Sequence, residues 1–394
     1  MPTTIHRYKV AQILFITLCC GIFACQKKQF ASAESIDFGK TYSKDSLQNK
    51  AIVIDALPNK AKFTRETLDI KINTLLYETA FNKLENMLAG KEMLSFKDAV
   101  FTVENAFYDN TLNRLEYDIT ISYLTFLCNA WCETNKTNYK ETDSAQVLAS
   151  AAIYKIITDS IIDIKGNVAS LPYTYDFNDN FAQQHWPNMF VTKLLNTHKG
   201  NCHSLPFLYK ILADEMKVKA YLSFLPNHIY IKQKCKKSGW YNTELTNNMF
   251  PSDAWLMASG YVSREAIVSG IYMDTISDKQ SISICLNDLA KGYLRRFKYN
   301  ANLDFVIQCC NLGLQHFPNY AELLLLKAET LKKMYETNKT PEFYTEMENT
   351  YALLVKLHYR EVPSSMFNEW ITTMKTGENI YSKTNKIIFN NEIK

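Results

Sequence analysis

Three residues in chain order carry side chains suited to nucleophilic catalysis. Cys202 opens a helix predicted from about residue 202 to 216. A helix N-terminus favours a thiolate, because free backbone N–H groups and the helix dipole stabilise negative charge. The thiolate is the form of cysteine that attacks a carbonyl carbon. His228 begins a predicted strand, and a neutral imidazole in reach of the thiol would take its proton and later protonate the leaving amine.

A third strand supplies the acid. The pattern of residues 239–245 predicts a strand with Trp240, Asn242 and Glu244 on one face. Either polar side chain would accept the second imidazole N–H, which fixes the tautomer and stabilises the imidazolium. The alternative is that both simply face solvent. We take Glu244 as the acid and keep Asn242 as the alternative.

The same chemistry requires a site for the developing oxyanion. The backbone N–H of Cys202 would be one donor, and a side chain upstream would be the second. Asn188 has a suitable spacing, and the other candidates are Gln183, Gln184 and Asn196. We interpret His198 and His203, which flank the nucleophile, as ordinary loop residues.

The elements around these residues follow from hydrophobic periodicity. Helical spacing extends through residues 64–165, with helices expected at 96–107, 114–133 and 143–162, and a loop follows at 166–179. A short helix is expected at 186–196, and Gly200 would let the chain turn tightly.

Strands are predicted at 218–225, 228–233 and 239–245. In the second strand, alternation separates His228 from Ile229 and Ile231. The isoleucine face should point to the core, which leaves His228 toward a helix or cleft.

The last third of the chain is helical again. Residues 304–316, a break at Pro318, and residues 321–335 form a degenerate helix-turn-helix of the tetratricopeptide kind, with Phe297, Val306 and Gly313 near that repeat's usual bulky and small positions. A further helix is expected at 343–359 on the same stack.

Residues 186–255 resemble the transglutaminase-like cysteine hydrolase superfamily. The likeness rests on Lys199-Gly200-Asn201-Cys202, on Pro226-Asn227-His228, and on Trp240 four residues before Glu244 with Thr246 beyond it. The family's acid is usually Asp, so Glu244 is one methylene longer. The subgroup with C-terminal tetratricopeptide repeats is the most similar.

This resemblance implies an α+β fold, with a papain- or transglutaminase-like core in which a helix packs on a small antiparallel sheet. The expected organisation is a signal peptide, a tether, a helical N-terminal region, a transglutaminase-like core and tetratricopeptide-like helices. These segments are expected at 1–24, 25–60, 61–180, 181–282 and 283–380.

The N-terminus has the three parts of a signal peptide. A basic start precedes an apolar run at 10–23, which is shorter than the roughly 20 residues that span a membrane. Ile22-Phe23-Ala24-Cys25 resembles the lipobox of bacterial lipoproteins, in which the Cys is lipidated; the alternative is an ordinary cleaved signal. The resemblance implies a lipid anchor at Cys25 in the cell envelope, on the outer membrane and facing the periplasm.

The composition of the chain excludes some classes of binding partner and cofactor. The net charge of +4 over 394 residues gives no case for nucleic acid. Of ten cysteines, Cys19, Cys20 and Cys25 belong to the signal and its lipidation site, which leaves an odd seven. Cys128 and Cys132 lie one helical turn apart, but no further His or Cys nearby completes a metal site, so we interpret them as core residues. The proposed chemistry needs no cofactor.

Three functions remain in competition. The first is a thiol hydrolase or acyltransferase that acts on an amide, such as a peptide or a cell-wall cross-link. The second is a catalytically inactive lipoprotein that binds protein partners through its tetratricopeptide-like helices. The third is a purely structural envelope protein. A reactive thiol and a cleft that joins Cys202, His228 and Glu244 would favour the first.

Overall fold

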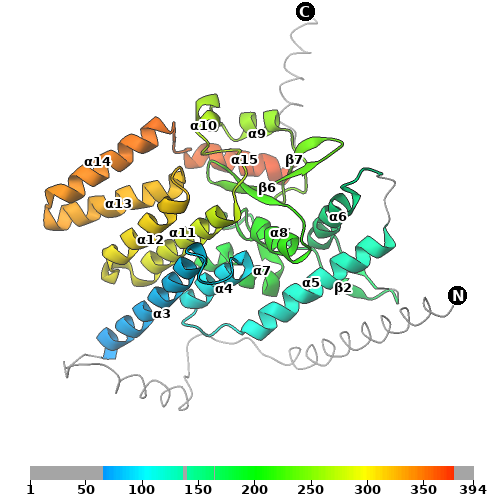
Figure 1. Ribbon diagram of the computed structural model, residues 1–394, viewed down its shortest axis with the longest axis horizontal. Coiled ribbons are helices and arrows are strands. Elements are labelled where there is room, and N and C mark those ends of the chain that lie inside the picture. Colours follow the sequence, from blue (N-terminus) through cyan, green and yellow to red (C-terminus); the bar gives the residue numbers. More distant parts are fainter. Residues whose placement is uncertain (1–64, 136–139, 164, 377–394) are drawn as a thin grey trace, which may run out of the picture. The chain divides into compact units, whose positions relative to one another are not determined.

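Helices make up most of the protein, and small sheets lie between them, so the fold is α+β. The computed structural model describes residues 65–376, apart from 136–139 and 164 (Figure 1). The predicted signal peptide, Cys25 and the tether lie outside the described residues. Within the described ranges, no helix is both long enough and apolar enough to cross a membrane.

The α-helices are α3 (Arg65–Leu88), α4 (Phe96–Phe107), α5 (Arg114–Thr134), α6 (Ser144–Thr158), α7 (Val191–Thr197), α8 (Ser204–Glu215), α9 (Asp253–Ser259), α10 (Arg264–Val268), α11 (Asp278–Phe297), α12 (Leu303–His316), α13 (Ala321–Asn338), α14 (Pro341–Lys356) and α15 (Ser364–Thr376). The strands are β1 (Ile161–Ile162), β2 (Val168–Ser170), β3 (Thr174–Tyr175), β4 (Lys199–Gly200), β5 (Tyr221–Leu225), β6 (His228–Cys235) and β7 (Gly239–Thr243). Short 3₁₀ helices, η1 and η2, cover Trp186–Met189 and Lys298–Asn300.

The N-terminal helices are close to the predicted ones. Ser95 caps α4 by accepting a hydrogen bond from the Asp98 N–H, and Asn113 caps α5 in the same way. The predicted helix at 143–162 is wrong at its end. It stops at Thr158, and Ile161 pairs with Ser170 in the small β1–β2 hairpin. A short β-branched apolar run suits a strand as well as a helix, so periodicity alone did not separate the two.

The three predicted strands form one antiparallel sheet in the order β5-β6-β7. Leu225 pairs with His228 across the first turn, and Ile231 pairs with Thr243 across the second strand pair. Residues 228–233 are buried on both faces, with α8 packed on the sheet. The expectation of a single buried isoleucine face was therefore incomplete, because a second layer of side chains also covers the histidine face.

The C-terminal helices are continuous with the core. Helix α11 begins at Asp278, after a capping box made by Ser277 and Gln280. The boundary predicted between 282 and 283 therefore falls inside this helix. The Tyr293 ring of α11 meets the Tyr77 ring of α3 edge to face, with 5.2 Å between centroids. Helices from both ends of the described chain thus share one hydrophobic core.

Helices α12 and α13 match the predicted helix pair at 304–316 and 321–335, and α14 lies against α13. The last helix, α15, was not predicted from the sequence. Figure 1 shows α15 returning from this series of helices to the neighbourhood of β6 and β7. Its apolar side chains Phe367 and Trp370 are buried, which brings a C-terminal segment to the sheet that carries His228.

Candidate active site

His228 and Glu244 form a buried pair at the centre of the site. The His228 Nε2 atom lies 2.6 Å from Glu244 Oε2, and the side chains are 0% and 2% exposed. Strand β6 begins at His228, while Glu244 follows β7 and is held by two backbone hydrogen bonds to Met249. The other carboxylate oxygen, Oε1, accepts a hydrogen bond of 2.8 Å from the Thr246 N–H. Both oxygens of the acid are therefore fixed in place.

This contact favours the ionised form of both groups. Burial alone would raise the pKa of Glu244, but the His228 charge and the Thr246 N–H outweigh it and leave that pKa lowered. Burial alone would lower the pKa of His228, but the Glu244 charge, together with contact to Cys202, raises it to about 10. The contact therefore stabilises an imidazolium at His228 beside the Glu244 carboxylate.

Cys202 lies in the turn that leads into α8. The Asn201 side chain begins this turn, since its Oδ1 accepts hydrogen bonds from the His203 and Ser204 N–H groups. The helix itself starts two residues later than expected, at Ser204. The Cys202 Sγ atom lies 3.9 Å from the Asn227 carbonyl oxygen, next to His228 in the chain.

The second ring nitrogen of His228 is available to the thiol. Its Nδ1 makes no hydrogen bond to any residue in the described part of the chain, and Cys202 is among the groups that raise the His228 pKa. The structure therefore brings Cys202, His228 and Glu244 together, in the order of roles that the spacing predicts. Asn242 is not part of this group, because its amide donates to Pro251 and Asp253.

Gly200 allows the turn to pack closely. A Cβ atom at this position would collide with the Ser204 hydroxyl and approach the Leu194 side chain to 2.8 Å. The backbone of Gly200 is part of β4 and has no positive φ. The glycine is thus required for close approach between segments, whereas the sequence suggested a tight turn.

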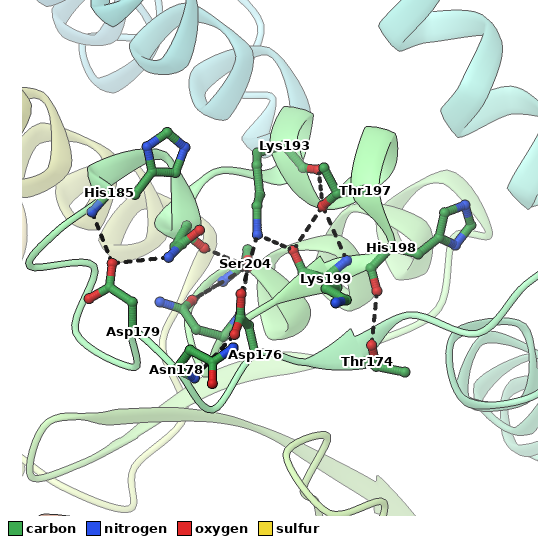
Figure 2. A network of polar contacts seen from close by, with 12 residues as sticks. Thr174, Asp176, Asn178, Asp179, His185, Lys193, Thr197, His198, Lys199 and Ser204 are labelled. Carbon is green, nitrogen blue, oxygen red and sulfur yellow. Dashed lines mark hydrogen bonds and ion pairs between the residues drawn. The ribbon is translucent and has the colours of Figure 1, made fainter. Parts of the chain in front are cut away.

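Hydrogen bonds fix the loop before the nucleophile, as Figure 2 shows. The Asp179 carboxylate accepts hydrogen bonds from the backbone N–H groups of Gln183 and His185. It also accepts one of 3.1 Å from the Asn188 side-chain amide. The Asn188 carbonyl in turn accepts from the Ser204 hydroxyl. Asn188, the predicted oxyanion donor, is therefore already engaged in holding this loop.

His203, the residue after Cys202, is buried. We had predicted an ordinary loop residue at this position. His203 Nε2 lies 3.0 Å from Asp288 of α11, and its Nδ1 lies 3.0 Å from the Met189 carbonyl oxygen. Burial opposes its protonation, but the Asp288 charge prevails and raises the pKa of His203. His198 differs: its half-buried ring stacks on Tyr173, and its backbone ends α7 in a left-handed conformation.

Helix α15 covers His228. The Trp370 ring meets the His228 ring edge to face, with 4.6 Å between centroids. One turn earlier, Phe367 packs on Phe181 of the loop before the nucleophile at 4.4 Å. The Phe367/Trp370 pair was missed by sequence reasoning. Its only local signal is two aromatic residues three positions apart, a spacing typical of one helix face.

Tyr175 is a second residue that the sequence did not single out. Strand β3 pairs in parallel with β4, which aligns Tyr175 with Gly200, two residues before Cys202. Its buried hydroxyl makes no hydrogen bond to a described residue. Burial and the neighbouring Cys202 raise the pKa of Tyr175 well above its ordinary value. The alternation of Tyr173 and Tyr175 after Pro172 would have indicated a short strand, where we expected a loop.

A cavity of about 430 Å³ opens at Cys202. One wall comes from the loops around the nucleophile and includes Trp186 and Asn227. The opposite wall comes from α11 and α13, where Lys291 forms a 2.7 Å ion pair with Glu322. The complete lining is Asn180, Phe181, Trp186, Met189, Cys202, Asn227, Lys291, Leu294, Arg295, Glu322, Leu325, Leu326, Glu329, Tyr359 and Glu361. The thiol therefore faces a space large enough for part of a peptide.

The seven cysteines in the described ranges are all unpaired. Away from the cavity, Cys285 and Cys309 are buried in the hydrophobic core, and burial raises the pKa of each thiol well above its usual value. Cys128 and Cys132 lie on one face of α5, and burial raises the pKa of both. No group of three metal-binding side chains occurs within the described residues.

No protein-family model and no curated protein matches the chain. A solved structure of menin, whose crystal structure reveals the binding site for the Mixed Lineage Leukemia (MLL) protein, was found at 10% sequence identity. The match covers 73% of this chain and 67% of that chain, with a TM-score of 0.30. At that score the similarity carries no argument about the fold or function of this protein.

Proposed function

We propose that the protein is a thiol hydrolase or acyltransferase that acts on amide bonds through Cys202, His228 and Glu244. The observation that carries this proposal is the buried 2.6 Å contact between His228 and Glu244, with the other ring nitrogen unbonded and Cys202 next to it. A histidine that serves only as a structural ion pair has no need of a free nitrogen beside a thiol that lines a cavity.

The reaction follows from these groups. His228 takes the proton of the Cys202 thiol, and the resulting thiolate attacks the amide carbonyl carbon, so that a sulfur electron pair forms the C–S bond while the carbonyl electrons move onto oxygen. When the oxyanion collapses, the C–N bond breaks, and the His228 imidazolium gives its proton to the leaving amine. The product is a thioester on Cys202 and a neutral imidazole held by Glu244.

Water or an amine then resolves the thioester. His228 takes a proton from the incoming nucleophile, which attacks the thioester carbonyl. The C–S bond breaks, and the sulfur leaves as the thiolate beside the renewed imidazolium. Glu244 stabilises the imidazolium and holds the ring orientation throughout. Water as the nucleophile gives hydrolysis, and an amine gives acyl transfer.

A transglutaminase-like core is part of the same proposal. Its support is the chain order of a cysteine before a helix, a histidine that begins a strand and an acid beyond the next strand, together with the helix α8 packed on β5 and β6. The longer Glu244 side chain starts just past the end of β7, and it still reaches His228.

The substrate class is a peptide, a protein or a cell-wall amide, in keeping with a lipid-anchored protein of the envelope. That location rests on the sequence around Cys25 alone, which lies outside the described residues. An outer-membrane anchor facing the periplasm would give the enzyme access to both kinds of amide.

A second proposal is a binding protein without turnover, which presents tetratricopeptide-like helices to a protein partner. The observation that favours it is the far wall of the cavity, which α11 and α13 build from Leu294, Leu325 and Leu326 beside charged groups. Such a mixed wall suits a peptide side chain whether or not the thiol reacts.

The reactivity of the thiol separates the two proposals. We would alkylate the full chain with iodoacetamide at pH 6 and follow modification of Cys202 by mass spectrometry of its peptide. If His228 activates the thiol, the His228→Ala variant reacts at least about tenfold more slowly, in line with the usual contribution of a general base.

The matched control is His185→Ala, because His185 is an exposed histidine upstream of the same turn. That variant should react at the rate of the unmodified protein. Equal Cys202 rates in the unmodified protein and in His228→Ala would contradict the enzymatic proposal and favour the binding protein.

A further inference from the structure

The Tyr175 side chain lies against the turn that carries Cys202. The parallel pairing of β3 with β4 fixes its backbone opposite Gly200, and the N–H of Asp176 donates to the Gly200 carbonyl at 2.7 Å. The side chain is buried at 8% exposure, and its ring packs against Phe177. These contacts hold the tyrosine against the turn that carries the nucleophile.

The hydroxyl is buried, and within the described residues no hydrogen bond of regular geometry reaches it. The groups closest to a hydrogen bond with it belong to Cys202. A buried hydroxyl without a partner costs free energy, so its retention calls for a group that binds there during function. The neighbouring groups are the thiol and the backbone N–H of Cys202, and the latter is the donor that thiol acyl transfer uses for its oxyanion.

We infer that Tyr175 is a catalytic residue that donates its hydroxyl proton, as a hydrogen bond, to the oxyanion of the tetrahedral intermediate, together with the Cys202 N–H. The inference rests on the proposed thiol chemistry of Cys202. It assigns the side-chain donor that the sequence sought in Asn188, whose amide holds Asp179 instead.

The ionisation state of Tyr175 suits a donor. Burial in the site, with Cys202 and Glu244 nearby, raises the pKa of Tyr175 well above its ordinary value. The phenol therefore keeps its proton throughout the neutral range and cannot act as a base. A neutral donor that is itself buried stabilises developing negative charge more strongly than it would in water.

Two reactions of Cys202 separate this role from a structural one. Alkylation by iodoacetamide displaces iodide at a saturated carbon and forms no oxyanion, whereas acetylation by p-nitrophenyl acetate passes through one. In Tyr175→Phe we expect the acetylation rate of Cys202 to fall about 10²-fold, the usual effect of removing one oxyanion donor. The alkylation rate should stay within about twofold.

Tyr173→Phe is the matched control, because Tyr173 is also a buried tyrosine and lies two residues earlier, with its ring stacked on His198. It should leave both rates unchanged. The Phe substitution keeps the ring of Tyr175 and its contact with Phe177, and an unchanged melting temperature would verify that the variant folds.

The outcomes are distinct. Acetylation of Tyr175→Phe at the rate of the unmodified protein would overturn the role of Tyr175 and leave the proposed function standing. Equal losses of alkylation and acetylation would also overturn it, since they would show a general effect on the thiol. If the unmodified protein is not acetylated at Cys202 at all, the proposed function and the inference fail together.

Discussion

Two buried histidine–carboxylate pairs lie near Cys202. His203 contacts Asp288 at 3.0 Å, and His228 contacts Glu244 at 2.6 Å. Both histidines are buried, and in both the carboxylate raises the histidine pKa. By the usual criteria of burial and a perturbed pKa, both pairs would be candidates for catalysis.

The difference lies in the second nitrogen of each ring. In His203 that nitrogen is occupied by the Met189 carbonyl oxygen, so the ring joins the nucleophile turn to η1 and α11. In His228 the Nδ1 atom has no hydrogen bond within the described ranges. A perturbed pKa therefore identifies a buried ion pair only. A histidine that can act as a base differs from one that is purely structural by a ring nitrogen without a hydrogen-bond partner.

The largest expected contrast is between the two carboxylates. Glu244→Gln removes the charge that orients His228 and stabilises the imidazolium. We expect the acetylation rate of Cys202 by p-nitrophenyl acetate to fall by at least about 10²-fold, and by up to about 10⁴-fold as for the orienting acid of other triads.

Asp288→Asn makes the corresponding change at the other pair. It should lower the acetylation rate of the folded protein by no more than about threefold, because His203 takes no part in the chemistry. Similar losses in the two variants, measured on protein shown to be folded by circular dichroism, would erase the distinction between the two histidines.

On stability the two pairs should behave alike. His203→Ala leaves Asp288 buried without its partner, and His228→Ala does the same to Glu244. Each change should lower the free energy of unfolding by about 3–5 kcal/mol, the usual cost of an uncompensated buried charge. Urea unfolding followed by tryptophan fluorescence measures both, and a loss below about 1 kcal/mol in either variant would show that its pair is not buried in solution.

The smallest expected effect is the pH dependence of stability. A histidine whose pKa is higher in the folded protein contributes stability that is complete below its unfolded pKa of about 6.5. That contribution decreases above pH 6.5 and is lost as pH rises through the folded pKa, which is about 10 for His228. As pH rises from 7 to 8, the stabilising contribution of each histidine to the free energy of unfolding should therefore decrease by no more than about 1.4 kcal/mol.

Variants of the two histidines show which residue causes the decrease in the free energy of unfolding with pH. His228→Gln and His203→Gln should each flatten the decrease between pH 7 and 8, and the double variant should flatten it most. A smaller decrease near pH 7 should remain in all variants, because burial raises the pKa of Glu104 to about 7. A slope that is unchanged in His228→Gln would contradict the raised pKa of that histidine.

The sequence by itself determined the order and the local setting of the reacting groups. Apolar spacing predicted α4 and α5 and the helix after Cys202, because one buried helix face repeats with the helical period. The alternation around His228 predicted β6, and the pattern of residues 239–245 predicted Glu244 in the next strand, whereas the structure places it one residue beyond the end of β7. These features depend only on residues that are close together in the chain, so they can be predicted from a single sequence.

Only the tertiary structure decided which polar groups meet. The choice of Glu244 over Asn242 depends on how the chain leaves β7, and the commitment of Asn188 to Asp179 depends on the loop before the nucleophile. Tyr175 reaches Cys202 through a parallel strand pair between segments with no shared periodicity.

The same reason explains the two other contacts that the sequence did not reveal. Asp288 approaches His203 from α11, and Trp370 approaches His228 from α15, each across a long stretch of chain. Neither partner differs locally from an ordinary helix residue. Periodicity records which face of an element is buried, and the identity of the segment that buries it is set only when distant elements pack together.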